Sequence, residues 1–491
     1  MASGAAWMVS FKIIDRGVGI VSTAILARLL VPEDFGLISL ASSVIAILEL
    51  LGAFGLESAL VQRTDANRTH FDAVWTFNIA FGICLGLLVA AVAEPTANFY
   101  GDPRLVSVML IIGLRYAIGG FENVGIVMFR KELNFEMDFK FMVTKRLITS
   151  FLVAIPLAFF LRNYWALLAG SLAGTCISVA LSYAIHPYRP RLSFTGLGEL
   201  MGFSKWLFLT SLIGVLDSRS SSLIVGRWAG PAALGSLSMA REIASIASRE
   251  LAAPINRAAF PAYSKMSNDR ELLQRNFLKL LSIVLLLTIP AGVGLGVLAE
   301  PIVLLMLGER WTETVPLIRL LALNGVLGVF LSTAHHLNLA VGMARSTSLV
   351  IAGNAVITIP VMVWLVPTHG SYGAAAAALA GSCVTAPLNI YLVGRVIKFG
   401  AKELFAITYR PVIGCLVMVG ALITVMSIWT VPHSAVGRAS YLIVLSIFGG
   451  STYFATVWAL WRLSRNPESG EAWILEKVDD LKCGMITRLL S

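Results

Sequence analysis

The stretch Arg28-Leu-Leu-Val-Pro32-Glu-Asp-Phe-Gly36 separates two apolar runs and has a second, altered copy, Arg227-Trp-Ala-Gly-Pro231-Ala-Ala-Leu-Gly235. We call these the first and second turn motifs. Arginine, proline and glycine keep the same spacing in both. Each motif closes one apolar run and opens the next, so the pair predicts equivalent helix–turn–helix units in two halves of the chain.

A second pair of motifs follows in the same order. Ala93-Glu94-Pro95 and Ala299-Glu300-Pro301 each end a third predicted helix, and a glycine follows at nearly the same distance, Gly101 or Gly308. Six helices per half in one orientation form a parallel repeat, which is common in secondary transporters, with the substrate site between the halves. We therefore predict two six-helix lobes followed by two further helices.

The composition places this repeat in a membrane. Of the 491 residues, 57% are hydrophobic and only 13% are charged, with a mean hydropathy of +0.80, whereas soluble domains carry about 25% charged residues. A soluble enzyme is excluded, and the predicted fold class is an all-α membrane protein. About fourteen apolar runs are long enough to span a bilayer: 8–30, 37–61, 71–92, 105–129, 141–161, 165–185, 206–228, 232–255, 277–299, 315–341, 347–366, 372–397, 412–431 and 441–461.

Basic residues predict the orientation and the domain boundaries. About 23 lysines and arginines fall in segments on one side of the predicted spans and about 6 on the other, and the basic side is cytoplasmic. Both termini are then cytoplasmic. The predicted parts are a first lobe (1–186), a cytoplasmic connector (187–205), a second lobe (206–398), two extra helices (399–462) and an amphipathic cytoplasmic tail (463–491).

Several functions are not supported by the sequence. The net charge of +10 does not indicate nucleic-acid binding, because the basic residues lie in short segments between apolar runs. The five cysteines lack the spacing of a zinc site, and the adjacent His335 and His336 diverge by about 100 degrees on a helix. No nucleotide-binding or catalytic motif occurs. We expect no metal, no cofactor and no enzymatic activity.

The turn motifs and several shorter segments resemble the polysaccharide-export branch of the multidrug/oligosaccharidyl-lipid/polysaccharide exporter superfamily, the flippases of lipid-linked oligosaccharides. The segments that carry the resemblance are 25–37, 58–63 (SALVQR), 99–103 (FYGDP), 129–135 (FRKELNF) and 300–311 (EPIVLLMLGERW). The resemblance implies two lobes around a central cavity and alternating access for a polyprenyl-pyrophosphate-linked sugar unit. It also implies a bacterial inner membrane, exopolysaccharide or lipopolysaccharide synthesis, and contact with membrane lipids and with polymerase or export proteins.

Charged residues inside two helices of the predicted first lobe are candidates for the substrate cavity, because a charge at mid-bilayer costs at least about 2.5–3.5 kcal/mol. Lys12, Asp15 and Arg16 share one helix face. They indicate either the wall of a cavity that meets a pyrophosphate or an ordinary cytoplasmic helix end. Arg115 and Glu122 also share a face, and either contact an anionic headgroup through the arginine or pair with each other.

Charged residues in the predicted second lobe support two further hypotheses. Asp217 and Arg219 begin a polar run inside the seventh predicted helix and indicate either a cavity segment or an intramembrane salt bridge. Arg241, Glu242 and Arg249 form a polar stripe on the eighth predicted helix. This stripe is either part of the substrate site or a network of self-neutralising pairs.

Ion coupling and rival functions complete the predictions. Glu49 and Glu122 are candidates for ion coupling, because burial raises the pKa of a carboxyl group. A drug exporter of the same superfamily calls for an acidic cavity, whereas the embedded charge here is mixed to basic. A glycosyltransferase or polymerase needs a sizeable catalytic loop. The alternatives to a flippase are therefore the drug exporter, such an enzyme, or a scaffold that transports nothing.

Overall fold

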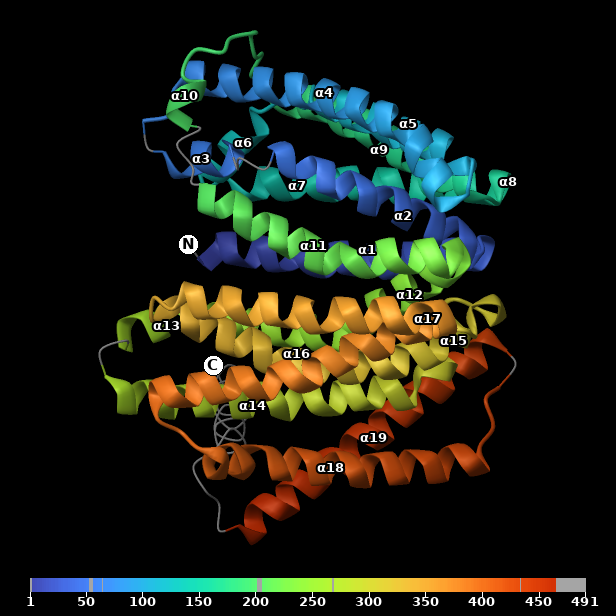
Figure 1. Ribbon diagram of the computed structural model, residues 1–491, viewed down its shortest axis with the longest axis vertical. Helices are drawn as coiled ribbons and strands as arrows, with labels where there is room; N and C mark the ends of the chain where they lie inside the picture. The colour runs from blue at the N-terminus through green and yellow to red at the C-terminus, as the bar shows by residue number, and fades with distance from the viewer. Residues whose placement is uncertain are drawn as a thin grey trace, which may run out of the picture. The chain divides into compact units, whose positions relative to one another are not determined.

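The computed structural model describes residues 2–52, 56–63, 65–200, 205–266, 269–432 and 434–464. Every regular element in these ranges is a helix (Figure 1). The chain divides into two compact units, Met1–Ser238 and Met239–Ser491. The predicted lobe boundaries remain predictions, and most of the predicted tail lies outside the described residues.

The first unit is a bundle in which α4, α5 and α9 pack side by side and α7 packs against both α1 and α9 (Figure 1). Its elements are α1 (Ala2–Leu29), α2 (Pro32–Glu49), η1 (Leu50–Gly52), α3 (Leu56–Gln62), α4 (Arg68–Tyr100), α5 (Arg104–Gly119), α6 (Ile126–Lys131), α7 (Phe135–Leu147), the π-helix η2 (Ile148–Ala154), α8 (Ile155–Leu161), α9 (Tyr164–Ile185), α10 (Leu197–Leu200), α11 (Lys205–Trp228) and the start of α12 (Gly230–Ser245).

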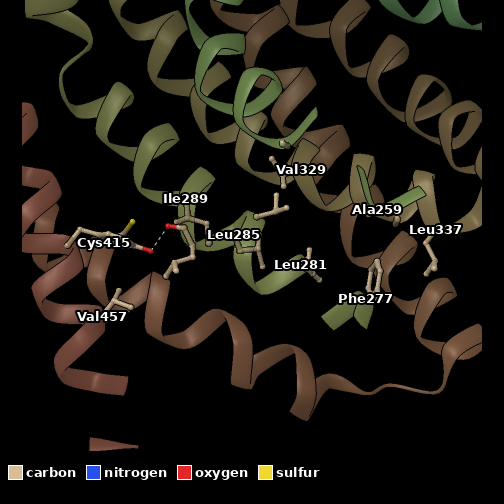
Figure 2. Close-up of a cluster of buried hydrophobic side chains, with 14 of the residues drawn as sticks. Ala259, Phe277, Leu281, Leu285, Ile289, Val329, Leu337, Cys415 and Val457 are labelled. Atoms are coloured by element: carbon tan, nitrogen blue, oxygen red, sulfur yellow. Dashed lines mark hydrogen bonds between the residues drawn. The ribbon is translucent and has the colours of Figure 1, made fainter. Parts of the chain in front are cut away.

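The second unit is built around α14. Its elements are the end of α12, the π-helix η3 (Ile246–Glu250), α13 (Leu251–Met266), α14 (Arg270–Val297), α15 (Ala299–Met306), η4 (Glu309–Trp311), α16 (Thr314–Ala340), α17 (Ala344–Ile397), α18 (Ala401–Ile428) and α19 (Ala435–Leu463). Leu281, Leu285 and Ile289 recur every four residues on α14 and so form one buried stripe. Figure 2 shows this stripe meeting side chains of α13, α16, α18 and α19.

A tyrosine of α19 compensates for a proline in α14. Pro290 has no backbone N–H, so the carbonyl of Leu286, four residues earlier, lacks its helical donor. The Tyr453 hydroxyl donates to this carbonyl at 2.9 Å, and the tyrosine is fully buried. An unpaired backbone group is especially costly in a membrane, where water cannot replace the partner.

Tyr453→Phe is therefore expected to lower the free energy of unfolding by about 1–3 kcal/mol, the usual cost of an unsatisfied buried acceptor. A denaturant titration in detergent micelles would measure it. Adding Pro290→Ala restores the missing N–H, so the double variant should lose less than the two single changes together. Tyr391→Phe, on a side chain that is 61% exposed, is the control. Additive losses would contradict this account.

The helix α17 is a hairpin of two helices. Gly370 has φ 56° and ψ −138°, outside the helical region. The Thr385 hydroxyl donates to the Asn354 amide oxygen at 3.2 Å, although 31 residues separate them. A straight helix would hold these residues about 46 Å apart. The chain therefore folds back at Gly370, as the separate predicted runs 347–366 and 372–397 require.

The other predicted apolar runs also fall on helices, but their number as membrane spans is not settled. Nine helices in the described ranges are long and apolar enough to cross a membrane. Two of the predicted spans that are not among these nine helices lie on α1 and α5. The helix α1 carries too many charges, and α5 is too short, with 16 residues. The runs 37–61 and 105–129 are interrupted in the structure, after Glu49 and Gly119 respectively. The predicted number of about fourteen stays a prediction.

The two turn motifs lie against each other within the first unit. A Cβ added at Gly36 would lie 1.7 Å from the carbonyl oxygen of Pro231, and one added at Gly235 would lie 1.8 Å from that of Pro32. Three residues beyond each glycine, the hydroxyls of Ser39 and Ser238 are 2.9 Å apart, with a separation of 199 residues along the chain. Equivalent positions of the repeat therefore meet around a local twofold axis, and only glycine permits this approach.

The aspartate of the first turn motif joins two helix starts. The Asp34 carboxylate accepts the backbone N–H of Val31 at 3.1 Å, which caps α2. It also accepts the N–H of Tyr164 at 2.9 Å, at the start of α9. The side chain is buried, so it replaces water for two helix-terminal donors that have no partner within their helices.

The second motif pair is only partly regular. Gly101 and Gly308 both have a positive φ, 73° and 95°, but their ψ angles differ, 23° at Gly101 and 179° at Gly308. The preceding segments differ. The helix α4 continues through Pro95 to Tyr100, whereas α14 ends at Val297 before its proline. The expectation that both motifs end a helix is therefore wrong for the first copy.

The start of the predicted connector is a strap fixed to α4. Asp72 accepts the Tyr188 hydroxyl at 2.7 Å and the backbone N–H of Arg191 at 2.9 Å. The N–H of Ser193 bonds the Thr76 hydroxyl at 2.9 Å. Burial and the neighbouring Asp72 carboxylate raise the pKa of Tyr188, which keeps this phenol a donor. These bonds tie the segment after α9 back to the first unit.

Candidate functional site

The first unit contains a cavity of about 760 Å³. Its walls come from α1, α3, α4, α5, α6, α7, η2 and α9 and from the turn between α5 and α6. Ligand pockets typically measure about 300–1,000 Å³, so the cavity could hold a headgroup of a few rings. Four cationic and three anionic side chains line it: Arg115, Arg130, Lys145, Arg146, Asp15, Glu57 and Glu122.

An ion pair links α1 to α7 inside the cavity. The Nε of Arg146 lies 3.2 Å from the Oδ1 of Asp15, and both side chains are less than half exposed. Gly19 follows Asp15 by one helical turn, and a Cβ there would lie 3.0 Å from the Nη2 of Arg146. The guanidinium therefore lies along one face of α1, where Asp15 supplies the charge and Gly19 supplies the space.

A second ion pair involves the turn after α5. Glu122 accepts the Ser178 hydroxyl of α9 at 2.8 Å, and its carboxylate lies 3.9 Å from the Nζ of Lys145. The interpretation of Arg115 and Glu122 as one helix face is wrong, because α5 ends at Gly119. The two side chains nevertheless line the same cavity.

Arg115 carries a charge in the cavity without a carboxylate partner in the described part of the chain. Its guanidinium lies 5.0 Å from the ring centroid of Tyr116, and the Tyr116 hydroxyl is close to Glu49. An arginine held by an aromatic ring keeps its donors available for planar contact with an anion. Arg115 is therefore the lining residue best placed to receive a phosphate.

Glu57 and Arg130 come from the short helices α3 and α6. Arg130 also pairs with Asp138 at 3.3 Å. Glu57 and Arg130 both line the cavity, together with Glu122.

Lys145 and Arg146 are, with Arg130, functional candidates that the sequence predictions missed. They lie at the end of α7, directly before the π-helix η2, whose Thr149 also lines the cavity. Isolated π-helical turns are frequent at functional sites. Two adjacent cations inside the apolar run 141–161 were the available signal.

The cavity brings together three of the predicted site residues, Asp15, Arg115 and Glu122. Four others belong to the first unit but do not line this cavity: Lys12, Arg16, Glu49 and Arg219. Arg241 and Glu242 lie on α12 in the second unit. The side chains of Asp217 and Arg249 lie outside the described residues. The roles of all these residues remain predictions.

The fold and the cavity define a multi-pass membrane protein of the transporter class. The fold is that of the solved lipid II flippase MurJ in an inward closed conformation, with a TM-score of 0.73 and 14% identity over 92% of this chain and 99% of that one. An inward-facing multidrug resistance MATE transporter matches with a TM-score of 0.55 and 17% identity over 78% and 96% of the two chains.

The chain belongs to the polysaccharide biosynthesis protein family, whose family model matches residues 25–316. It is 27% identical to the lipopolysaccharide biosynthesis protein WzxC of Escherichia coli (strain K12), over 66% of this chain and 67% of WzxC. It is also 27% identical to the succinoglycan biosynthesis transport protein ExoT of Rhizobium meliloti (strain 1021), over 65% of each. The matched region spans about two thirds of both relatives. The resemblance to the polysaccharide-export branch is confirmed.

Proposed function

We propose that this protein translocates lipid-linked, polyprenyl-pyrophosphate oligosaccharide units across a bacterial inner membrane by alternating access, for exopolysaccharide or lipopolysaccharide synthesis. Membership of the polysaccharide biosynthesis family supports this proposal. So do the names of its relatives, one a lipopolysaccharide biosynthesis protein and one a succinoglycan transport protein. In this proposal both termini are cytoplasmic, and polymerase or export proteins receive the translocated unit.

The cavity of the first unit is the observation that carries the proposal for the site. Seven charged side chains around one hollow carry a desolvation cost in an apolar helical bundle, which favours a functional reason for gathering them there. Cationic and hydroxyl groups suit a pyrophosphate with its attached sugar. Arg115, Lys145 and Arg146 are the proposed phosphate ligands, and an isoprenoid tail would stay among the membrane lipids.

The proposal is tested by a clean deletion complemented with Arg115→Ala. The deletion should lose surface polysaccharide and accumulate undecaprenyl-linked units on the inner leaflet. The variant should show at least a tenfold lower export rate at equal membrane abundance, because one charge-assisted phosphate contact is worth about 1.5–3 kcal/mol. Arg162→Ala, which removes an exposed arginine at the end of α8, should export normally.

Two other results would overturn the proposal. Normal surface polysaccharide in the deletion strain, together with altered sensitivity to cationic drugs, would favour the multidrug exporter. Loss of polysaccharide without accumulation of lipid-linked units on the inner leaflet would favour a non-transporting scaffold of the export machinery.

A further inference from the structure

The cations of the cavity are not equivalent. Arg146 and Lys145 each face a carboxylate, Asp15 at 3.2 Å and Glu122 at 3.9 Å. Arg115 faces none in the described chain and rests on Tyr116. The fourth cation, Arg130, pairs with Asp138 at 3.3 Å. An anion that enters the cavity therefore finds one cation ready and three that already have a carboxylate partner.

A carboxylate and a phosphate compete for the same donors. Both are oxygen anions that accept charge-assisted hydrogen bonds from a guanidinium or an ammonium group. The groups lie in a partly dehydrated hollow, where an ion pair is stronger than at the surface. A phosphate can therefore engage Arg146 only by displacing Asp15, and Lys145 only by displacing Glu122.

The two carboxylates differ in what holds them when their cation leaves. Glu122 keeps the Ser178 hydroxyl as a donor. For Asp15, the ion pair with Arg146 is the one polar side-chain contact found within the described residues. This pair also bridges α1 and α7, which meet as well through the aromatic contact of Trp7 with Phe139, with ring centroids 4.9 Å apart. Displacing Asp15 would remove a polar tie between two helices.

We propose that Asp15 and Glu122 are internal counter-ions that an anionic headgroup must displace, and that displacement of Asp15 unties α1 from α7. This inference rests on the proposed function, since it assumes that a pyrophosphate enters this cavity. The counter-ions weaken ground-state binding and favour release, because each carboxylate returns to its cation when the headgroup leaves. Specificity follows too, since a neutral sugar cannot displace either carboxylate.

The test measures binding of farnesyl pyrophosphate to the purified full-length protein, together with export in cells. Asp15→Asn and Glu122→Gln keep the side-chain shape and remove the competing charge. Each variant should lower the dissociation constant for farnesyl pyrophosphate about tenfold. Each should also slow export, because the headgroup is released less easily. Farnesol should bind equally to all forms. The control is Glu136→Gln, since Glu136 pairs with the exposed Lys140 on the same helix α7 and does not line the cavity.

The outcomes separate this inference from the proposed function. Wild-type binding that depends on Arg115 but is unchanged or weakened by both neutral variants would overturn the counter-ion inference alone. Farnesyl pyrophosphate that binds no better than farnesol, with no effect of Arg115→Ala, would overturn the proposed site together with the inference. Glu122→Gln retains the Ser178 contact, so it tests the idea even if Asp15→Asn fails to fold.

Discussion

Gly36→Ala is expected to lower the free energy of unfolding by about 3 kcal/mol, at the upper end for overpacking a tight contact. The added methyl carbon would lie 1.7 Å from the Pro231 carbonyl oxygen and 2.9 Å from the backbone nitrogen of Gly235. Neither is a flexible side-chain end, so the two turn motifs must separate. A denaturant titration in detergent micelles would measure the loss.

Gly17→Ala is the matched control, since a Cβ at Gly17 has nothing within 4 Å and alanine favours the helix. The mirrored change, Gly235→Ala, should cost about as much as Gly36→Ala, because its Cβ would meet the Pro32 carbonyl in the same way. A loss below about 0.5 kcal/mol at both positions would mean that the motifs do not cross as described.

Asp34→Ala is expected to cost about 2–4 kcal/mol, because it leaves the N–H groups of Val31 and Tyr164 without an acceptor. Asparagine should rescue the variant only in part, since its amide NH₂ group would face one of the two donors. The same denaturant titration applies, and hydrogen exchange at the starts of α2 and α9 would locate the loss.

The adjacent Glu33 supplies the control for this second prediction. It pairs with Arg104 at the surface, where its side chain is 46% exposed. Exposed ion pairs contribute about 0–1 kcal/mol, so Glu33→Ala should change the free energy of unfolding by no more than about 1 kcal/mol. Equal losses at the two positions would refute the joining role of Asp34.

The helical membrane fold could be predicted from two features of the sequence, the apolar runs and the repeated turn motif. Apolar runs must form helices in lipid, where each backbone group needs a partner within the segment. The spacing shared by the two turn motifs predicted the repeat, and in the structure Gly36 and Gly235 lie close together. Hydropathy could not reveal the break after Glu49, because apolar residues continue across it, whereas Gly120, Glu122 and Asn123 were a local signal for the break after Gly119.

The site was harder to predict because a cavity is a property of packing between distant helices. Asp15, Arg115 and Glu122 stood out as charges within apolar runs. Lys145 and Arg146 lie in the apolar run 141–161 and drew no prediction, and their contacts with Glu122 and Asp15 identify them as cavity residues. The sequence therefore predicted which charged residues lie within apolar helices, but it could not predict which of them contact each other.

The crossing of the two turn motifs also bears on descent. A contact in which each position meets its own equivalent is isologous, the kind that two identical subunits form in a C2 dimer. Two half-length chains with one such motif each would associate through this same surface. Fusion of the two genes would then keep this dimer contact within a single polypeptide. Afterwards, neither copy can enlarge its glycine unless the opposite proline segment moves away, so the two copies must evolve together at this point.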